Sequence, residues 1–194
     1  MLMPFLTSGE TIVKATRTFA ISAALLLGVL VPSPGAAQDH YTYTISALGG
    51  FGGSLGDDDA GLGNRTLGLG LSLLREDRVH IGLRLVEIEF DEGVMLGRLT
   101  DASLRYLTAG GEYRFLESYY ESGLFIGVGL YDLEGFDAEA QLDSESGVGI
   151  VLGVTGEFEI NRRFGFVVEF MGHLTSMEDS NVFASGHAGI AVHF

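Results

Sequence analysis

The chain has 194 residues and a formal net charge of −15, with no cysteine and no tryptophan. This size fits one domain. The acidity argues against nucleic acid, whose phosphates require lysine and arginine, and the lack of cysteine excludes disulfides and thiolate metal sites.

The first 37 residues have the pattern of a cleaved secretory signal. Lys14 and Arg17 precede the apolar stretch 19–31, and a run of small residues ends at Ala37. The alternative is a retained membrane anchor, but the apolar stretch is short for a helix that spans a bilayer. We therefore expect residues 1–37 to be a signal peptide and residues 38–194 to be one domain.

Eight segments of that domain alternate with a period of two, which is typical of strands. In chain order they are residues 40–53, 66–74, 79–90, 103–115, 119–131, 146–160, 164–174 and 182–194. In the third segment the alternation changes phase after Leu85. This change indicates either a bulge or the end of the apolar zone near Val86.

The connections between these segments alternate in length. Three are short turns (75–78, 116–118 and 161–163), and four are longer loops (54–65, 91–101, 132–145 and 175–181). Strands of this length in even number are typical of a transmembrane barrel, with both termini on the side of the short turns. The sequence predicts an all-β fold, an eight-stranded antiparallel up-and-down transmembrane β-barrel.

The two faces of the strands indicate which way the barrel is turned. One face is broad and apolar, with aromatic residues near several strand ends, and the other is mostly glycine, serine and threonine with a few charges. A soluble barrel would place the apolar face inside. Arg84 facing lipid at mid-strand would cost about 2–4 kcal/mol, and glutamates somewhat less, so we expect the apolar face to point outward to lipid.

The charges on the inward face are candidate lumen residues. Symmetry of the connections predicts Arg114 opposite Glu121 and Glu169 opposite His187, with Arg84 near Glu169. Such a network could form an ion-selective gate, or a plug whose members satisfy one another; the narrow bore favours the plug. The predicted polar network of the lumen consists of Arg84, Glu112, Arg114, Glu121, Glu157, Glu169 and His187.

Two other features were considered as chemical sites. The predicted loops are acidic, beginning with the run Asp57–Asp59, but they lack a recognisable calcium-binding pattern, which favours a solvated rim. His173 precedes Thr175 and Ser176, and a histidine beside a hydroxyl can activate a nucleophile; the spacing differs from that of lipid-deacylating barrels. We expect no catalytic residue, no metal and no cofactor.

The signal segment, the eight alternating segments and the final strand 187–194 together resemble the small eight-stranded outer-membrane β-barrels, the porin-like and outer-membrane protein A-like group. In that group an alternating strand with a terminal aromatic is the signal that the barrel-assembly machinery reads. The resemblance assigns this role to Ile190, Val192 and Phe194.

The resemblance implies an integral protein of the bacterial outer membrane with periplasmic termini. We expect a non-enzymatic monomer whose partners are outer-membrane lipid and, during biogenesis, the assembly machinery. Its role would be structural or in surface interaction. The alternatives are a narrow porin-like channel for small solutes and a lipid-modifying enzyme.

Overall fold

The structure, a computed structural model, describes residues 43–56, 61–76, 78–117 and 120–194, with only the backbone for residues 75, 76, 116 and 117. The predicted signal segment and the run Asp57–Asp59 lie outside the described residues. Among the described residues, no helix is long and apolar enough to cross a membrane.

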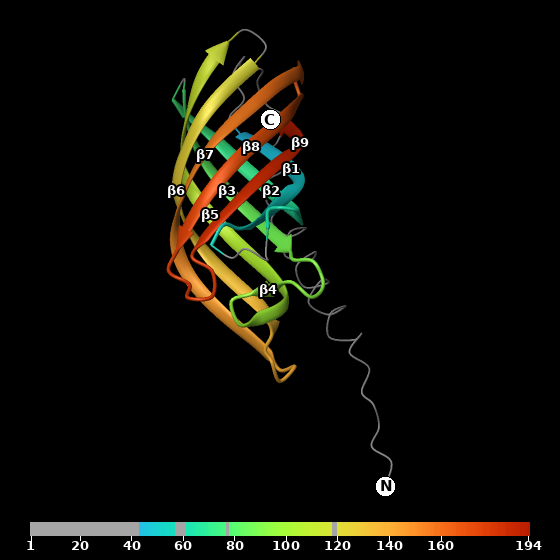
Figure 1. The fold of residues 1–194 in the computed structure, drawn as a ribbon. Coiled ribbons are helices and arrows are strands. Elements are labelled where there is room, and N and C mark those ends of the chain that lie inside the picture. Colours follow the sequence, from blue (N-terminus) through green and yellow to red (C-terminus); the bar gives the residue numbers. More distant parts are fainter. Residues whose placement is uncertain (1–42, 57–60, 77, 118–119) are drawn as a thin grey trace. The chain divides into compact units, whose positions relative to one another are not determined.

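The described chain forms one antiparallel sheet that closes on itself. Neighbouring strands follow the order β3-β2-β1-β9-β8-β7-β6-β5-β4, and β3 also pairs with β5, which closes an eight-stranded barrel (Figure 1). The two-residue strand β4 pairs only with the start of β5. The predicted closed eight-stranded barrel is confirmed. The strands are β1 (Tyr43–Ser54), β2 (Asn64–Glu76), β3 (Val79–Glu89), β4 (Met95–Leu96), β5 (Leu99–Glu117), β6 (Tyr120–Phe136), β7 (Leu142–Asn161), β8 (Phe164–Thr175) and β9 (Val182–His193).

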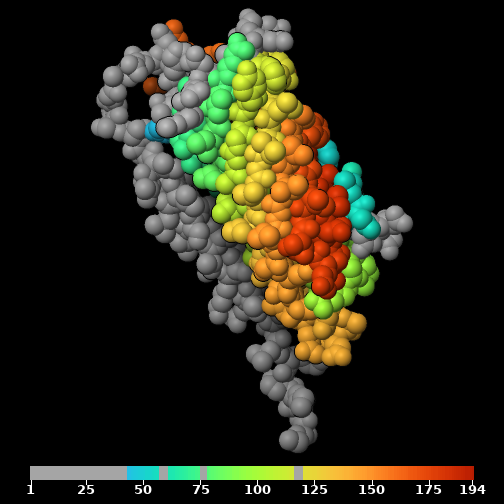
Figure 2. Space-filling view, turned by 90° about the vertical axis from the view of Figure 1, so that its left-hand side faces the viewer, coloured from blue at the N-terminus to red at the C-terminus, as the bar shows by residue number. Residues whose placement is uncertain are grey.

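The outer surface of the barrel is apolar over its central part. On β6 the exposed residues Leu124, Ile126, Val128 and Leu130 alternate with inward residues and are 54–63% exposed. Similar outward rows lie on the other strands, which run side by side as oblique bands in Figure 2. In water this surface would be a severe liability. It matches the hydrocarbon band of a bilayer.

Two predicted loops are partly strand. The segment 132–145 extends β6 to Phe136 and begins β7 at Leu142, leaving a turn of residues 137–141. Likewise β5 begins at Leu99, with an irregular pairing between Thr100 and Ser103. This β6–β7 hairpin is the farthest extension at the lower end of the barrel in Figure 1. Strand character was hidden there because the acidic residues interrupt the apolar pattern.

The phase change after Leu85 has a related cause. The β2–β3 and β3–β5 ladders run through Val86 without a register shift, so there is no bulge at that point. Instead, Val86 and Ile88 are fully buried inside the barrel, while Glu87 faces outward. The strand has left the apolar zone, as the second reading of the sequence predicted.

The same reversal crosses four neighbouring strands in register. Leu85, Leu107, Leu130 and Val148 form a paired apolar row on the outside. Two residues closer to the long loops on each strand, the next paired outward row consists of Glu87, Arg105, Asp132 and Ser146. Arg105 donates from Nε to Glu87 Oε1 at 2.9 Å within this polar row. The next outward row is again polar (Glu89, Ser103, Glu134 and Ser144), whereas the inward Ile88, Leu104 and Leu133 are fully buried.

Candidate functional site in the barrel lumen

Arg84 lies at the centre of the lumen and joins three strands. From β3 its Nε donates to Glu169 Oε2 on β8 at 2.7 Å, and its Nη2 donates to Glu112 Oε2 on β5 at 3.2 Å. The guanidinium also lies over the ring of Phe125, 4.2 Å from its centroid. Because β3 and β8 are four positions apart among eight strands, the Arg84–Glu169 pair spans the bore.

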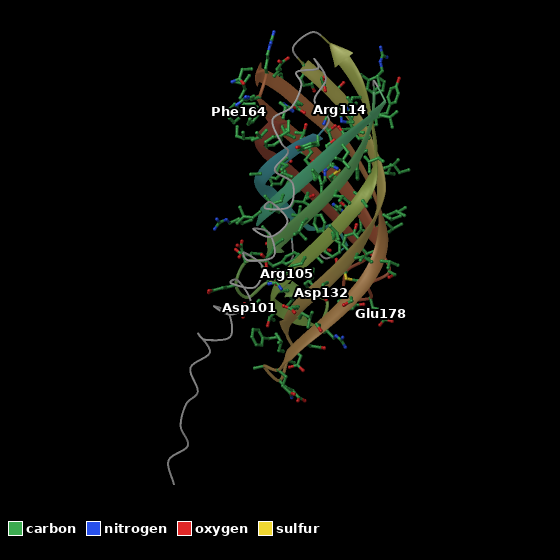
Figure 3. All side chains as sticks on the ribbon, turned by 180° about the vertical axis from the view of Figure 1, so that it is seen from behind. Asp101, Arg105, Arg114, Asp132, Phe164 and Glu178 are labelled. Atoms are coloured by element: carbon green, nitrogen blue, oxygen red, sulfur yellow. The ribbon has the colours of Figure 1, made fainter. Side chains whose placement is uncertain are left out.

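Arg114 forms a second centre nearer the short turns (Figure 3). Its Nε donates to Glu112 Oε1 at 2.7 Å, and its Nη1 reaches Glu121 at 3.0 Å and Glu157 at 2.8 Å. The predicted register is wrong by two residues, since Arg114 pairs with Gly123 across the β5–β6 hairpin. The Arg114 guanidinium still contacts Glu121, because the arginine side chain is long enough to extend from its own pair with Gly123 to the residue two positions away.

Two imidazoles complete the network. His187 pairs directly with Glu169 in the β8–β9 ladder, and its Nδ1 lies 3.2 Å from Glu169 Oε1. His193 Nε2 lies 2.8 Å from Glu157 Oε1. The sequence placed His193 on the same face as His187 but gave no reason to include it. The structure thus brings all seven predicted lumen residues together and adds His193.

The charges of this network balance only when the imidazoles are counted. Two arginines face four glutamates, so the network carries −2 with neutral histidines and zero when His187 and His193 are both protonated. Each histidine lies beside one of the glutamates. Every glutamate of the network therefore has a cationic or imidazole partner, which is the arrangement that a buried polar network requires.

Glycines on the inward face make room for these long side chains. A Cβ on Gly82 would lie 2.7 Å from Arg84 Nη1, and one on Gly123 would lie 2.9 Å from Glu112 Oε1. The absence of a side chain at these two glycines therefore allows the long side chains of Arg84 and Glu112 to lie across the inner wall.

A small cavity remains at this end of the lumen. It has a volume of about 30 Å³ and is lined by Thr44, Ser46 and Ser72 together with the charged network. A cavity needs about 10–15 Å³ to hold one water, so this one has room for about two. The polar part of the lumen therefore has room for about one or two water molecules beside the charged network.

On the long-loop side of the charged network, the side chains of Tyr106, Tyr131, His173 and Ser185 form one buried layer. His173 Nδ1 is 2.9 Å from the Tyr131 hydroxyl, and His173 Nε2 is 3.4 Å from Ser185 Oγ. Tyr106 packs on the His173 ring, with centroids 4.7 Å apart, and its hydroxyl is 3.1 Å from Ser185 Oγ. All four residues are buried.

The hydroxyls that the sequence paired with His173 lie elsewhere. Thr175 Oγ1 donates to the carbonyl of Ser180, and Ser176 Oγ accepts from the main-chain N–H of Val148. His173 is 3% exposed and faces the lumen rather than lipid. A histidine–hydroxyl pair that could act on a membrane lipid is therefore not formed at these residues.

The remainder of the lumen, toward the long loops, is apolar. Met177 from the β8–β9 loop inserts among side chains of the barrel wall and of the β4–β5 hairpin. None of the predicted lumen residues belongs to this hydrophobic tier, and the phase change near Val86 is its sign in the sequence. Its buried members are Val86, Ile88, Phe90, Leu96, Leu99, Ala102, Leu104, Tyr106, Tyr131, Leu133, Met177 and Phe183.

Polar contacts fasten the β8–β9 loop over this tier. Glu145 accepts from the main-chain N–H groups of Glu178 and Asp179. Arg98 Nη2 lies 3.3 Å from Asp143, and Arg98 Nε donates to Asp179 at 3.0 Å. Asp143 and Asp179 hold the pKa of Arg98 above its usual range. Within the part of the chain that the structure describes, no group of His, Cys, Asp or Glu is arranged to hold a metal ion.

Comparison with solved structures places this architecture among known barrels. Neisserial surface protein A matches with a TM-score of 0.65 at 12% identity, over 82% of this chain and 100% of that one. Ail of Yersinia pestis gives 0.57 at 17% identity, over 80% and 100%, and the N-terminal β-barrel domain of Pseudomonas aeruginosa OprF gives 0.56 at 13%, over 78% and 96%. No protein-family model and no curated protein sequence matches the chain.

The fold and its apolar outer surface define an eight-stranded transmembrane β-barrel. More particularly, the fold is that of the small eight-stranded outer-membrane barrels to which these structures belong.

Proposed function

We propose that this chain is a non-enzymatic integral protein of the bacterial outer membrane, with a closed lumen and a structural or surface-interaction role. The apolar band on the outside supports membrane insertion. The short turns would lie on the periplasmic side, together with Tyr43 and Phe194 at the two ends of the barrel sequence. The acidic β6–β7 hairpin would lie outside. The barrel would act as a monomer in outer-membrane lipid, and Ile190, Val192 and Phe194 would direct its assembly.

The observation that carries this proposal is that a buried ion pair and an apolar cluster follow each other along the lumen, which supports two barriers in series. The Arg84–Glu169 pair crosses the bore in the polar tier. The hydrophobic tier then fills the lumen toward the long loops, with Met177 and Phe183 both buried. An ion would have to break a buried ion pair and then cross an apolar core, and each step is costly.

Single-channel recording in planar bilayers tests the closed lumen against the alternative of a narrow solute channel. Folded protein should give no conductance steps, while a wide porin in the same bilayers reports that insertion can be detected. Arg84→Ala should also be silent, because it removes one barrier and leaves the hydrophobic tier. Steps from the unchanged protein would overturn the proposal, and steps from Arg84→Ala alone would show that only the polar tier seals the bore.

Mass spectrometry of lipid A tests the absence of enzymatic activity. The buried position of His173 and its contacts with Tyr131 and Ser185 support a packing role. Cells with and without the protein should have the same lipid A. A change that requires the protein and is lost in His173→Ala would establish the lipid-modifying alternative.

A further inference from the structure

The β6–β7 hairpin presents a strand edge that the rest of the barrel leaves unpaired. Strand β7 begins at Leu142, yet its last pair with β8 is Gly149 with Thr175. On its other side β7 stays paired with β6 as far as Leu142. Residues 142–147 therefore have a strand partner on one side only among the described residues.

The direction of the main-chain groups on this edge follows from Val148. Its N–H donates to Ser176 Oγ at 3.1 Å and its carbonyl accepts from the Ser176 N–H at 2.8 Å, both on the β8 side. Main-chain groups alternate between the two sides of a strand in an antiparallel sheet. The N–H and C=O groups of Leu142, Ser144 and Ser146 therefore point to the open side.

The chain covers only part of this edge itself. The Ser144 N–H is capped by Asp143 Oδ1 at 2.8 Å, while the other oxygen of Asp143 is held by Arg98 at 3.3 Å. The outward side chains along the edge are exposed, and Leu142 is 67% exposed. With the serines offering little bulk, a second strand could approach along Ser144 and Ser146.

The negative charge around the edge indicates the kind of partner that would bind there. Residues 132–146 contain six acidic residues and no lysine or arginine, and the exposed Glu178 lies at this same end of the barrel (Figure 3). A second copy of this chain would bring the same acidic segment against itself. We propose that the open edge of β7 binds an extended, lysine- or arginine-rich peptide segment of another protein, which adds a strand beside residues 142–147.

This inference rests on the proposed surface-interaction role and names the class of its partner. Binding is measured on folded barrels in lipid nanodiscs and does not depend on whether the lumen conducts. If no peptide bound, the proposal of a closed lumen would still stand. If the lumen conducted ions, the proposal of a binding edge would still stand.

The test uses fluorescent peptides of about eight residues, enough to pair with the open edge. The probe alternates threonine and lysine. One control replaces lysine with glutamate, and another carries N-methyl groups on alternate residues, which removes main-chain donors but keeps the charge. We expect only the first peptide to bind, with binding that weakens as salt is raised.

The matched protein variants are Ser146→Pro and Ser146→Ala. Proline removes the N–H that points to the open side and is tolerated at sheet edges, so binding should weaken by about tenfold or more. Alanine also loses the Ser146–Asp132 hydrogen bond but keeps the N–H, so binding should stay within about twofold. Equal binding of the N-methylated or glutamate peptide, or unchanged binding by Ser146→Pro, would overturn the proposal. If Ser146→Pro does not fold, the peptide comparison still decides.

Discussion

Arg84 and Glu169 face each other across the diameter of the barrel, with Nε and Oε2 2.7 Å apart and both side chains almost fully buried. The pair ties opposite walls together without any ladder between them. Both groups have further partners, Glu112 for the arginine and His187 for the glutamate. The contact is therefore a structural cross-brace between opposite walls of the barrel.

Breaking this brace on one side should strongly destabilise the barrel. Arg84→Met leaves Glu169 and Glu112 without their shared cation, and loss of one partner of a buried pair costs about 3–5 kcal/mol. Urea unfolding in lipid, followed by circular dichroism because the chain has no tryptophan, measures the change.

The matched control is Arg98→Ala. Its side chain is 61% exposed, so loss of its pairs should cost about 0–1 kcal/mol. Similar losses for the two variants would show that the lumen pair is not specially coupled. The double variant Arg84→Met with Glu169→Leu should recover part of the loss, because it leaves fewer uncompensated charges.

Neighbouring glycines on β5 should differ sharply in their tolerance of a methyl group. A Cβ on Gly110 would collide with the Ile126 carbonyl and lie 2.7 Å from the Phe125 ring, whereas one on the outward Gly111 would meet nothing within 4 Å. Gly110→Ala should lose about 1–3 kcal/mol, and Gly111→Ala should change stability little. The same urea titration compares them. Equal stability of the two would contradict the crowded lumen wall.

Closure of the barrel is directly visible on a gel. The closed, hydrogen-bonded sheet should resist detergent until it is heated. Unheated protein should therefore migrate differently from the boiled sample, while a chain boiled before loading gives the unfolded reference. Identical migration, together with solubility in the absence of detergent, would argue against the barrel in a membrane.

Phe194 should matter more for assembly than the acidic run on the β1–β2 connection. Its ring stacks on Tyr43, with centroids 5.3 Å apart, where β9 meets β1. Deleting Phe194 should lower the yield of folded protein in the membrane more than deleting Asp57–Asp59. Quantitative blotting of membrane fractions measures both yields.

Phe164→Ala is the control for the loss of an aromatic ring near the same end, since Phe164 is also exposed on the outside. If all three changes gave equal yields, the proposed assembly role of Phe194 would be refuted.

Much of the fold could be predicted because the alternation is local and repeats in every strand. The direct pairing of Glu169 with His187 followed from the symmetry of the loop 175–181. The Arg84–Glu169 contact across the bore depends on strand tilt and closure rather than on neighbouring residues, so the sequence could place the two residues near each other but not define the contact. His193 was missed since nothing local shows that a side chain at a strand end reaches Glu157.

The hydrophobic tier was missed for a different reason. Leu104 and Leu133 lie on the inward face in the same phase as the glycines and charges of the lumen. In the sequence of a single strand these leucines interrupt the lipid-facing alternation, and the acidic residues beside Leu133 suggest a loop. Only the pairing of four strands shows that the polarity reverses together along all of them.

That reversal marks where the barrel passes from hydrocarbon into water. Leu130 and Asp132 point to the same side of β6, one toward hydrocarbon and the other toward water, and their paired neighbours repeat the change. On the short-turn side of this boundary the apolar side chains point outward, the reverse of a soluble protein, and on the long-loop side Leu104 and Leu133 point inward as they would in one. Both the outward and the inward face of the strands therefore specify how deep the barrel lies in the membrane. A spin label moved stepwise along β6 would detect the change of surroundings on either face.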